Sequence, residues 1–192
     1  MTSDEALMLE FQGGSRAAFD ELFARYHEPL YGFFRRRLDS PERAEDLAQE
    51  TFLAVIRANS RYEPRALVRT YLYGIALKLV AAERRKQVRD GPAIIFVPDP
   101  AIDEAPDVAL WVQQALGRLD ASEREILMLR EYEQLSYCEI AELLRIPVNT
   151  VRSRLFRARL ALKSHLEPHA GSDSRLRTRL ASRAQDEACN DK

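Results

Sequence analysis

Four side chains in the last third of the sequence have the types and the spacing to bind DNA. They are Arg152, Ser153, Phe156 and Arg157. Intervals of three and four residues place them on one face of a helix. Arginine can donate hydrogen bonds to guanine and to phosphate alike, and no acidic residue occurs between positions 142 and 167. The pattern predicts a helix that enters the major groove of DNA.

The residues around this segment predict the rest of a helix-turn-helix. Ser136 and Glu139 form a capping box, so a helix is expected to start there, and Pro147 ends it because proline lacks a backbone donor. Apolar residues then line the other side of the second helix: Val148, Val151, Leu155, Ala158 and Leu162. A capped helix, a tight turn and a basic second helix suit DNA docking. The alternative is a surface helix whose arginines are merely solvated.

Composition narrows the class of protein. The chain has 192 residues, of which 46% are apolar and 31% charged, and its net charge of −1 argues against a non-specific DNA coat. Two cysteines, Cys138 and Cys189, exclude a disulfide framework and fit a reducing cytosol; Cys138 is expected to be a small buried residue. No apolar run approaches the about 20 residues of a membrane span, and no signal peptide is evident. We therefore expect a cytoplasmic protein without membrane insertion.

No motif supports catalysis, a cofactor or a metal. The sequence has no glycine-rich phosphate loop and no serine or cysteine nucleophile with a plausible base. His165 and His169 are four residues apart, but no third ligand is evident and Pro168 interrupts the helix between them. We expect no catalytic residue, no cofactor, no metal and no small-molecule substrate, so the protein is not expected to be an enzyme.

Helical patterns fill most of the chain and predict an all-α fold of two small domains. Helices are expected at about 3–11, 15–34, 40–59, 68–87, 108–119 and 122–132, followed by the helix-turn-helix. Between them, prolines and acidic residues at 88–106 predict a linker. The predicted organisation is a first domain at 1–87, the linker at 88–106, a second domain at 107–167 and a flexible polar tail at 168–192.

Four segments of this pattern resemble one known family. They are FDELFARYHEPLYGFFRRRL (19–38), AEDLAQETFLAV (44–55), TYLYGIALKLV (70–80) and LDASEREILMLREYEQLSYCEIAELLRIPVNTVRSRLFRARLAL (119–162). In their order and spacing they are similar to the extracytoplasmic-function (ECF) sigma factors of bacterial RNA polymerase, in the sigma-70 family. The resemblance implies that the first domain is sigma region 2 and the second, with its helix-turn-helix, is sigma region 4.

The resemblance implies a polymerase-binding edge in the first domain. Its residues would be Asp46, Gln49, Glu50 and Phe52, docked on the clamp coiled coil of the largest subunit of core RNA polymerase. The spacing places the three polar residues along one acidic edge, which suits a basic partner. An ordinary solvated helix face is the alternative. The implied partners are core polymerase (clamp coiled coil and flap), promoter DNA and an anti-sigma factor, with the two domains associated or held by that factor when free.

The resemblance also implies a −10 reader, which captures a base flipped from the non-template strand. Its residues would be Asn59, Ser60, Arg61, Tyr62, Arg65, Tyr71, Arg84, Arg85 and Lys86. Flipping costs stacking energy, which an aromatic ring and hydrogen-bonding groups can restore. The basic residues would hold phosphates of the adjoining DNA. Gly74 departs from the family pattern, which commonly has arginine at this position.

For the −35 element, the resemblance implies base contacts by Arg152, Ser153, Phe156 and Arg157, with Asn149 and Thr150 near phosphates. The predicted function is promoter-specific initiation, with −35 read as duplex and −10 as single strand. Two alternatives remain. A stand-alone helix-turn-helix regulator would usually dimerise on two half-sites. A protein that only sequesters polymerase would have no use for the basic DNA-binding residues.

Overall fold

The computed structural model describes residues 2–58, 62, 67–90 and 106–167, although the side chains at 87–90 and 106–109 are not described. These residues form eight helices and no strand, which confirms the predicted all-α fold. The helices are α1 (Asp4–Gln12), α2 (Arg16–Arg35), α3 (Pro41–Ala58), α4 (Val68–Asp90), α5 (Pro106–Gly117), α6 (Ala121–Glu131), α7 (Tyr137–Leu144) and α8 (Val148–Leu166). None of these helices, over the described ranges, has the length and apolar content that crossing a bilayer would require.

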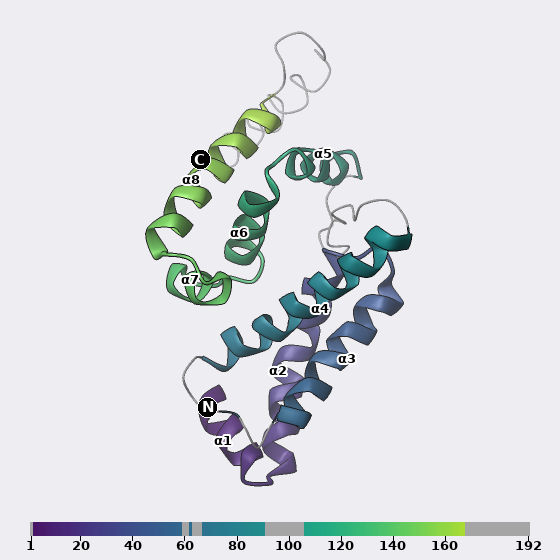
Figure 1. Ribbon diagram of the computed structural model, residues 1–192, viewed down its shortest axis with the longest axis vertical. Helices are drawn as coiled ribbons and strands as arrows, with labels where there is room; N and C mark the ends of the chain where they lie inside the picture. The colour runs from purple at the N-terminus through teal and green to yellow at the C-terminus, as the bar shows by residue number, and fades with distance from the viewer. Residues whose placement is uncertain (1, 59–61, 63–66, 91–105, 168–192) are drawn as a thin grey trace, which may run out of the picture.

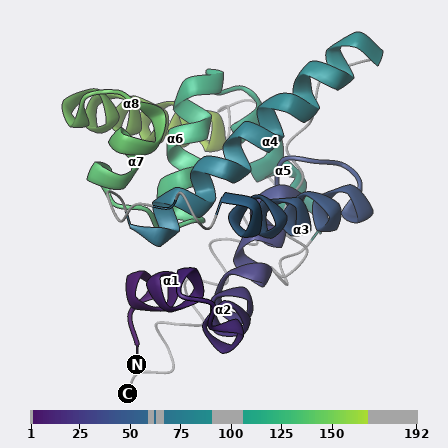
Figure 2. The same ribbon diagram turned by 60° about the horizontal axis from the view of Figure 1, so that its bottom comes forward.

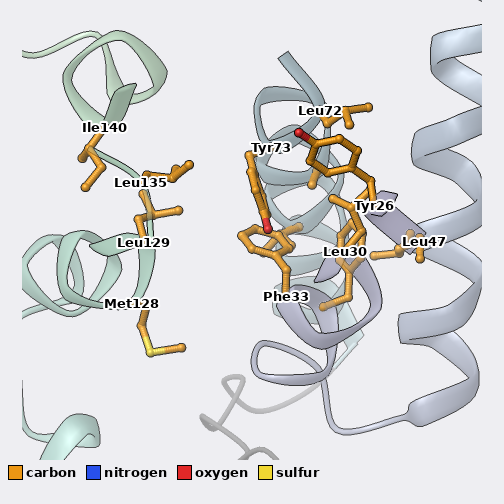
Figure 3. Close-up of a cluster of buried hydrophobic side chains, with 14 of the residues drawn as sticks. Tyr26, Leu30, Phe33, Leu47, Leu72, Tyr73, Met128, Leu129, Leu135 and Ile140 are labelled. Carbon is orange, nitrogen blue, oxygen red and sulfur yellow. The ribbon is translucent and has the colours of Figure 1, made fainter. Parts of the chain in front are cut away.

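The first four helices form a bundle around an aromatic and aliphatic core (Figure 1). Helix α2 packs against α3, α3 packs against α4, and α1 crosses α2 near the start of α4 (Figure 2). The spacing of apolar residues along α2 puts Leu30, Phe33 and Phe34 inside, where none of them is exposed. Leu47 of α3 and Leu72 of α4 complete this core, as Figure 3 shows for the side chains that it labels. The core thus holds α3 and α4 in place on α2.

The helix-turn-helix forms as its local signals predict. Ser136 and Glu139 make a complete capping box at the start of α7: the Glu139 N–H donates to Ser136 Oγ at 3.2 Å, and the Ser136 N–H donates to Glu139 Oε2 at 2.8 Å. Arg145 ends α7 in the left-handed conformation, at φ 54°, and Pro147 precedes α8. Helix α8 packs on α6 and α7 through the fully buried Val151 and Leu155. This packing leaves the opposite face of α8 in solvent.

The prediction for Cys138 is wrong, because its side chain is exposed. The buried residues of α7 are Glu139, Ile140 and Ala141, and Ile140 alone is fully buried. A residue two positions before Ile140 points to the opposite side of the helix from it, because successive residues turn by about 100°. The apolar stripe of α7 therefore turns Cys138 outward.

Two helix ends lie within the range predicted for the linker. Helix α4 continues to Asp90 and α5 begins at Pro106, where the sequence predicted a linker over 88–106. The remainder of that linker, at 91–105, and the predicted tail at 168–192 lie outside the described residues.

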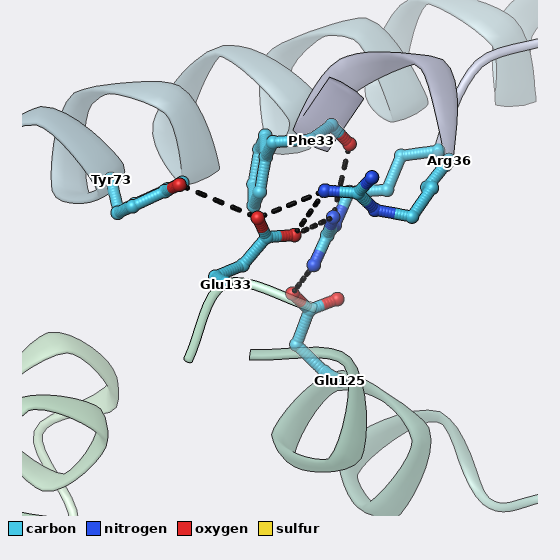
Figure 4. A network of polar contacts seen from close by, with 6 residues as sticks. Phe33, Arg36, Tyr73, Glu125 and Glu133 are labelled. Atoms are coloured by element: carbon cyan, nitrogen blue, oxygen red, sulfur yellow. Dashed lines mark hydrogen bonds and ion pairs between the residues drawn. The ribbon is translucent and has the colours of Figure 1, made fainter. Parts of the chain in front are cut away.

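One contact between the two domains is centred on the buried carboxylate of Glu133. Glu133, between α6 and α7, is 6% exposed and accepts hydrogen bonds from Arg36 Nη2 at 2.9 and 3.1 Å and from Arg37 Nη1 at 3.3 Å. The Tyr73 hydroxyl lies 3.4 Å from the same carboxylate (Figure 4). Burial and the neighbouring charge of Glu133 raise the pKa of Tyr73. Arg37 also donates to Glu125 of α6 at 2.9 Å, so arginines at the end of α2 hold two carboxylates of the second domain.

A second contact joins α4 to α7. Arg69 binds the Glu139 carboxylate through Nε at 3.0 Å and through Nη2 at 2.7 and 2.9 Å. Burial acts to raise the pKa of Glu139, but hydrogen bonds from Ser136 and Arg69 outweigh it and lower that pKa. A Cβ atom on Gly74 would lie 3.6 Å from Leu143 Cδ1, which is an ordinary van der Waals distance. The departure from the family's arginine at Gly74 thus coincides with close packing between the domains.

Candidate nucleic-acid and polymerase interfaces

The solvent-facing side of α8 carries the residues predicted to read the −35 element. Asn149, Arg152, Ser153, Phe156 and Arg157 are exposed, and Thr150 is half-buried. Phe156 is 68% exposed, which is unusual for so large an apolar side chain. The Ser153 hydroxyl donates to the Thr150 carbonyl oxygen at 3.1 Å. The structure therefore brings these six residues together along one helix, as the spacing predicted.

Acidic residues of α6 and its C-terminal end hold two arginines of α8. Arg157 Nε donates to Glu123 at 2.9 Å, and Arg159 Nη2 donates to Glu131 at 2.6 Å. These contacts lie on the flanks of α8, because α6 packs alongside it. They orient the guanidinium of Arg157 before any DNA binds. This pairing could not be predicted from local spacing, since Glu123 lies 34 positions before Arg157.

The predicted −10 residues are only partly described. Asn59, Ser60, Arg61 and Arg65 lie outside the described residues. Tyr62 was expected to offer its ring to a flipped base, but it is 7% exposed and meets the Tyr71 ring edge-on, with centroids 5.3 Å apart. Burial raises the pKa of both tyrosines. In this conformation Tyr62 cannot stack on a base unless it moves, and its predicted role remains untested.

The other predicted −10 residues lie near the far end of α4. Arg84, Arg85 and Lys86 are exposed there, more than three helical turns after Tyr71. The structure thus separates a basic group at this end from the aromatic pair near the start of α4. Such an arrangement suits contacts to phosphates some distance from a captured base.

The predicted polymerase-binding edge lies along α3. Asp46 and Gln49 are exposed, and Glu50 is half-exposed. Arg43 lies 3.7 Å from Asp46 and 3.1 Å from Glu50, and it bridges to Glu83 of α4 at 2.8 Å. Hydrogen bonds to Glu83 and Glu50 raise the pKa of Arg43, so it stays charged and offsets part of the acidic edge.

Phe52 does not share this exposed edge. It is 4% exposed and packs against Phe23, with ring centroids 4.7 Å apart. In this conformation Phe52 anchors α3 in the core of the first domain and presents no surface to a partner.

Sequence reasoning missed two members of this face of α3. Leu53 and Ile56 are each 46% exposed and continue the edge at intervals of three and four residues from Gln49. Neither residue was among those predicted to bind polymerase. These two exposed residues could have been predicted from the number of apolar residues in the helix, which is larger than one buried stripe can hold. Together with the acidic residues they make an edge that is apolar at one end.

Within the described ranges, no group of three or more histidine, cysteine, aspartate or glutamate side chains could hold a metal ion. His165 lies on α8, whereas His169 is outside those ranges.

Comparison with known families accounts for both domains. Residues 22–90 match the family described as Sigma-70 region 2, and residues 109–162 match Sigma-70, region 4. The first match covers most of α2 and all of α3 and α4, for which a stand-alone helix-turn-helix regulator offers no role. The regulator alternative is therefore rejected.

Relatives extend the likeness over nearly the whole chain. The RNA polymerase sigma-H factor of Pseudomonas aeruginosa is 36% identical over 182 residues, which covers 86% of this chain and 94% of that one. The ECF RNA polymerase sigma-E factor of Escherichia coli K12 is 32% identical over 183 residues, with 86% and 95% covered.

Solved structures show the same arrangement of helices. CnrH, in complex with the cytosolic domain of CnrY, superposes with a TM-score of 0.66 at 26% identity, covering 89% of this chain and 100% of that one. The sigma factor RpoE of Bartonella quintana, in complex with the anti-sigma factor NepR, gives 0.65 at 25% identity, covering 78% and 97%. Matches in both domains, at this identity and coverage, show that the chain belongs to the ECF sigma factors of the sigma-70 family.

Proposed function

We propose that this sigma factor reads the −35 element as duplex DNA through α8 and the −10 element as single-stranded DNA through the first domain. The observation that carries the proposal is the exposed face of α8, with Arg152, Phe156 and Arg157 on a helix whose other face is buried. The backbone N–H groups at the start of α8, beside Asn149 and Thr150, suit phosphate contacts. Sigma factors are not enzymes, and no catalytic role is assigned to any residue.

The proposal assigns core-polymerase binding to the edge of α3. Asp46, Gln49 and Glu50 supply negative charge and hydrogen-bonding groups, and Leu53 and Ile56 supply apolar area. Interfaces of this kind combine an apolar centre with complementary charge, which sets orientation and association rate. Phe52 would contribute indirectly, by holding α3 in place. The predicted partner surfaces are the clamp coiled coil and, for the second domain, the flap.

The proposal includes an anti-sigma factor as a partner. CnrH and the Bartonella RpoE were each solved as a complex, with the cytosolic domain of CnrY and with NepR respectively. Their similarity to this chain supports an equivalent partner here. A cytoplasmic location follows from the proposed work on polymerase and promoter DNA. The proposed domain bounds are 1–87 and 107–167, joined by the linker at 88–106.

Run-off transcription from a randomised promoter library tests the function. The full chain is mixed with core polymerase, and transcripts are sequenced with and without the chain. We expect transcripts that share one −35 and one −10 sequence. Sequence-specific DNA binding without transcripts would contradict the proposal, and polymerase binding without transcripts would favour the sequestering protein.

A further inference from the structure

Arg43 of α3 lies between three carboxylates that belong to two helices. Its Nη2 donates to Glu83 of α4 at 2.8 Å. Its Nη1 donates to Glu50 at 3.1 Å and lies 3.7 Å from Asp46. Asp46 and Glu50 belong to the proposed polymerase-binding edge of α3, whereas Glu83 lies outside that edge. One guanidinium is therefore shared between the edge and the neighbouring helix.

The three contacts of Arg43 are not equivalent. The Glu83 side chain is 12% exposed, compared with 44% for Glu50 and 62% for Asp46. A carboxylate with little access to water depends on a charged partner more than an exposed carboxylate does. The hydrogen bond from Arg43 lowers the pKa of Glu83 in spite of this burial, so the carboxylate stays charged. Distance and burial both make Glu83 the preferred partner of Arg43.

The surroundings leave the Arg43 side chain room to turn. A hollow of about 350 Å³ lies beside it, and the lining includes Glu50 and Glu83. Without the charge of Glu83, the guanidinium could turn fully toward Asp46 and Glu50 on its own helix, the first of which is three positions away. It would then neutralise negative charge that attracts a basic partner to the edge.

We propose that Glu83 is a positioning residue for polymerase binding, which draws Arg43 toward α4 and so keeps the acidic edge of α3 available to basic groups of core polymerase. This inference rests on the proposed function of that edge. Charges at the rim of an interface act mainly on the association rate, because they attract the partners before contact. Glu83 therefore acts through Arg43 and does not have to touch polymerase. The alternative is an ordinary ion pair that only fastens α4 to α3.

The test measures binding of the full chain to immobilised core RNA polymerase by surface plasmon resonance, at low ionic strength where charges are least screened. Glu83→Gln keeps the shape of the side chain but removes the charge that holds Arg43. Arg43→Gln removes the shared positive charge, and the variant with both changes completes a double-mutant cycle. The matched controls are Asp20→Asn and Arg16→Gln, which remove the same charges from an exposed pair on α2.

Glu83→Gln should lower the association rate constant by about two- to fivefold, the range that one exposed ion pair supports. Arg43→Gln should raise this constant by a similar factor, because the edge then carries more net negative charge. In the variant with both changes, the effect of Glu83→Gln should disappear. The two controls should leave the constant unchanged.

Other outcomes of the cycle would overturn the inference. If the ion pair only fastens α4 to α3, both single variants should slow association and lower the melting temperature. If Glu83 acts only through its own charge, Glu83→Gln should slow association equally with and without Arg43. An unchanged rate for Glu83→Gln would also contradict the proposal. Loss of folding cannot imitate the expected result, because it cannot make Arg43→Gln bind faster.

The two proposals can fail separately. If the unmodified chain does not bind core polymerase, or if Asp46→Arg binds normally, the proposed role of the α3 edge fails. If the unmodified chain binds and Asp46→Arg does not, the edge stands, and a cycle without the expected coupling removes only the role of Glu83.

Discussion

Arg152 and Arg157 share the exposed face of α8 but differ in what they contact. Arg157 donates to Glu123 at 2.9 Å, whereas Arg152 forms no ion pair with any described residue. An exposed ion pair contributes only about 0–1 kcal/mol, so DNA can displace Glu123 at small cost. Both arginines are thus available to bases, but substitution of Arg152 disturbs less of the free protein.

Arg152→Ala should weaken transcription from promoters with the preferred −35 element by about 1–3 kcal/mol, if its guanidinium reads a base. The effect should shrink when the contacted base pair is replaced, because the specific contact is then already lost. Run-off transcription on a set of −35 variants measures both quantities. Lys163→Ala, which removes an exposed charge farther along α8, serves as the control. An equal loss on every −35 variant would assign Arg152 to phosphate instead.

At the scale of helices, the sequence predicted the features that depend on contacts between residues close together in the chain. The capping box of α7 and the turn before Pro147 depend on residues three or four positions apart, so they could be found without a structure. The second role of Glu139 could not, because its partner Arg69 lies 70 positions away. The burial of Tyr62 depends in the same way on α1 and Tyr71.

The same difference between local and distant contacts applies to the candidate sites. Helical spacing predicted the exposed face of α8 and the polar part of the α3 edge. The resemblance placed Phe52 on the polymerase-binding edge, but the side chain is buried, because several apolar residues of α3 compete for one buried stripe. The packing of α2 and α4 against α3 determines which apolar side chains of α3 are buried.

Asp46→Arg should abolish binding to core polymerase without unfolding the first domain. The side chain is exposed and its described ion pair, to Arg43, is long at 3.7 Å, so the folded state loses little. Opposing like charges across an interface costs several kcal/mol, which is more than about a hundredfold in affinity. Co-purification with core polymerase measures binding, and thermal unfolding measures stability. Asp20→Arg, the same reversal on the exposed side of α2, is the control; normal co-purification of Asp46→Arg would remove this edge from the interface.

At the scale of the molecule, buried charged groups join the two domains in a closed arrangement. Arg36, Arg37 and Glu133 are each almost fully buried, in a contact between residues up to 97 positions apart. Buried charges are tolerated only when they are paired, and removal of one partner is strongly unfavourable. In this molecule the free-energy cost of unpaired buried arginines can be removed by separation of the domains, because separation exposes the arginines to water. Loss of Glu133 should therefore open the molecule before it unfolds either domain.

Glu133→Ala should increase the radius of gyration in solution scattering, while helical content stays unchanged. The expected cause is the buried charge of Arg36, which loses its carboxylate partner in the closed state, while Arg37 keeps its pair with Glu125. Glu131→Gln is a suitable control, because Glu131 pairs with Arg159 inside the second domain and is exposed. An unchanged radius for Glu133→Ala would show that the remaining contacts between α4 and α7 suffice to hold the domains together.

Acidification should weaken the same closed arrangement through Glu139. Its pKa is lowered in the closed state, partly by Arg69, and that contribution disappears when the domains separate. A carboxylate with a lowered pKa favours the closed form above its ordinary pKa of about 4.3, and the contribution is lost as the pH falls through the lowered value. Scattering at constant ionic strength should show an unchanged closed form from pH 7 down to about 5 and opening as the pH falls below about 4.3. Arg69→Ala should abolish most of the pH-dependent opening that is due to the Arg69–Glu139 pair.

The exposed edge of α3 has a consequence for the order of events during polymerase assembly. Helix α3 lies on the side of the first domain away from α7, so Asp46 and Gln49 remain accessible while the domains are closed (Figure 1). Core polymerase can therefore bind the closed molecule first through α3, and the second domain then separates from the first domain and binds polymerase at its own surface. Stopped-flow association should then show two phases, the slower of which reaches a plateau at high polymerase concentration. That plateau would report the intrinsic speed of domain separation.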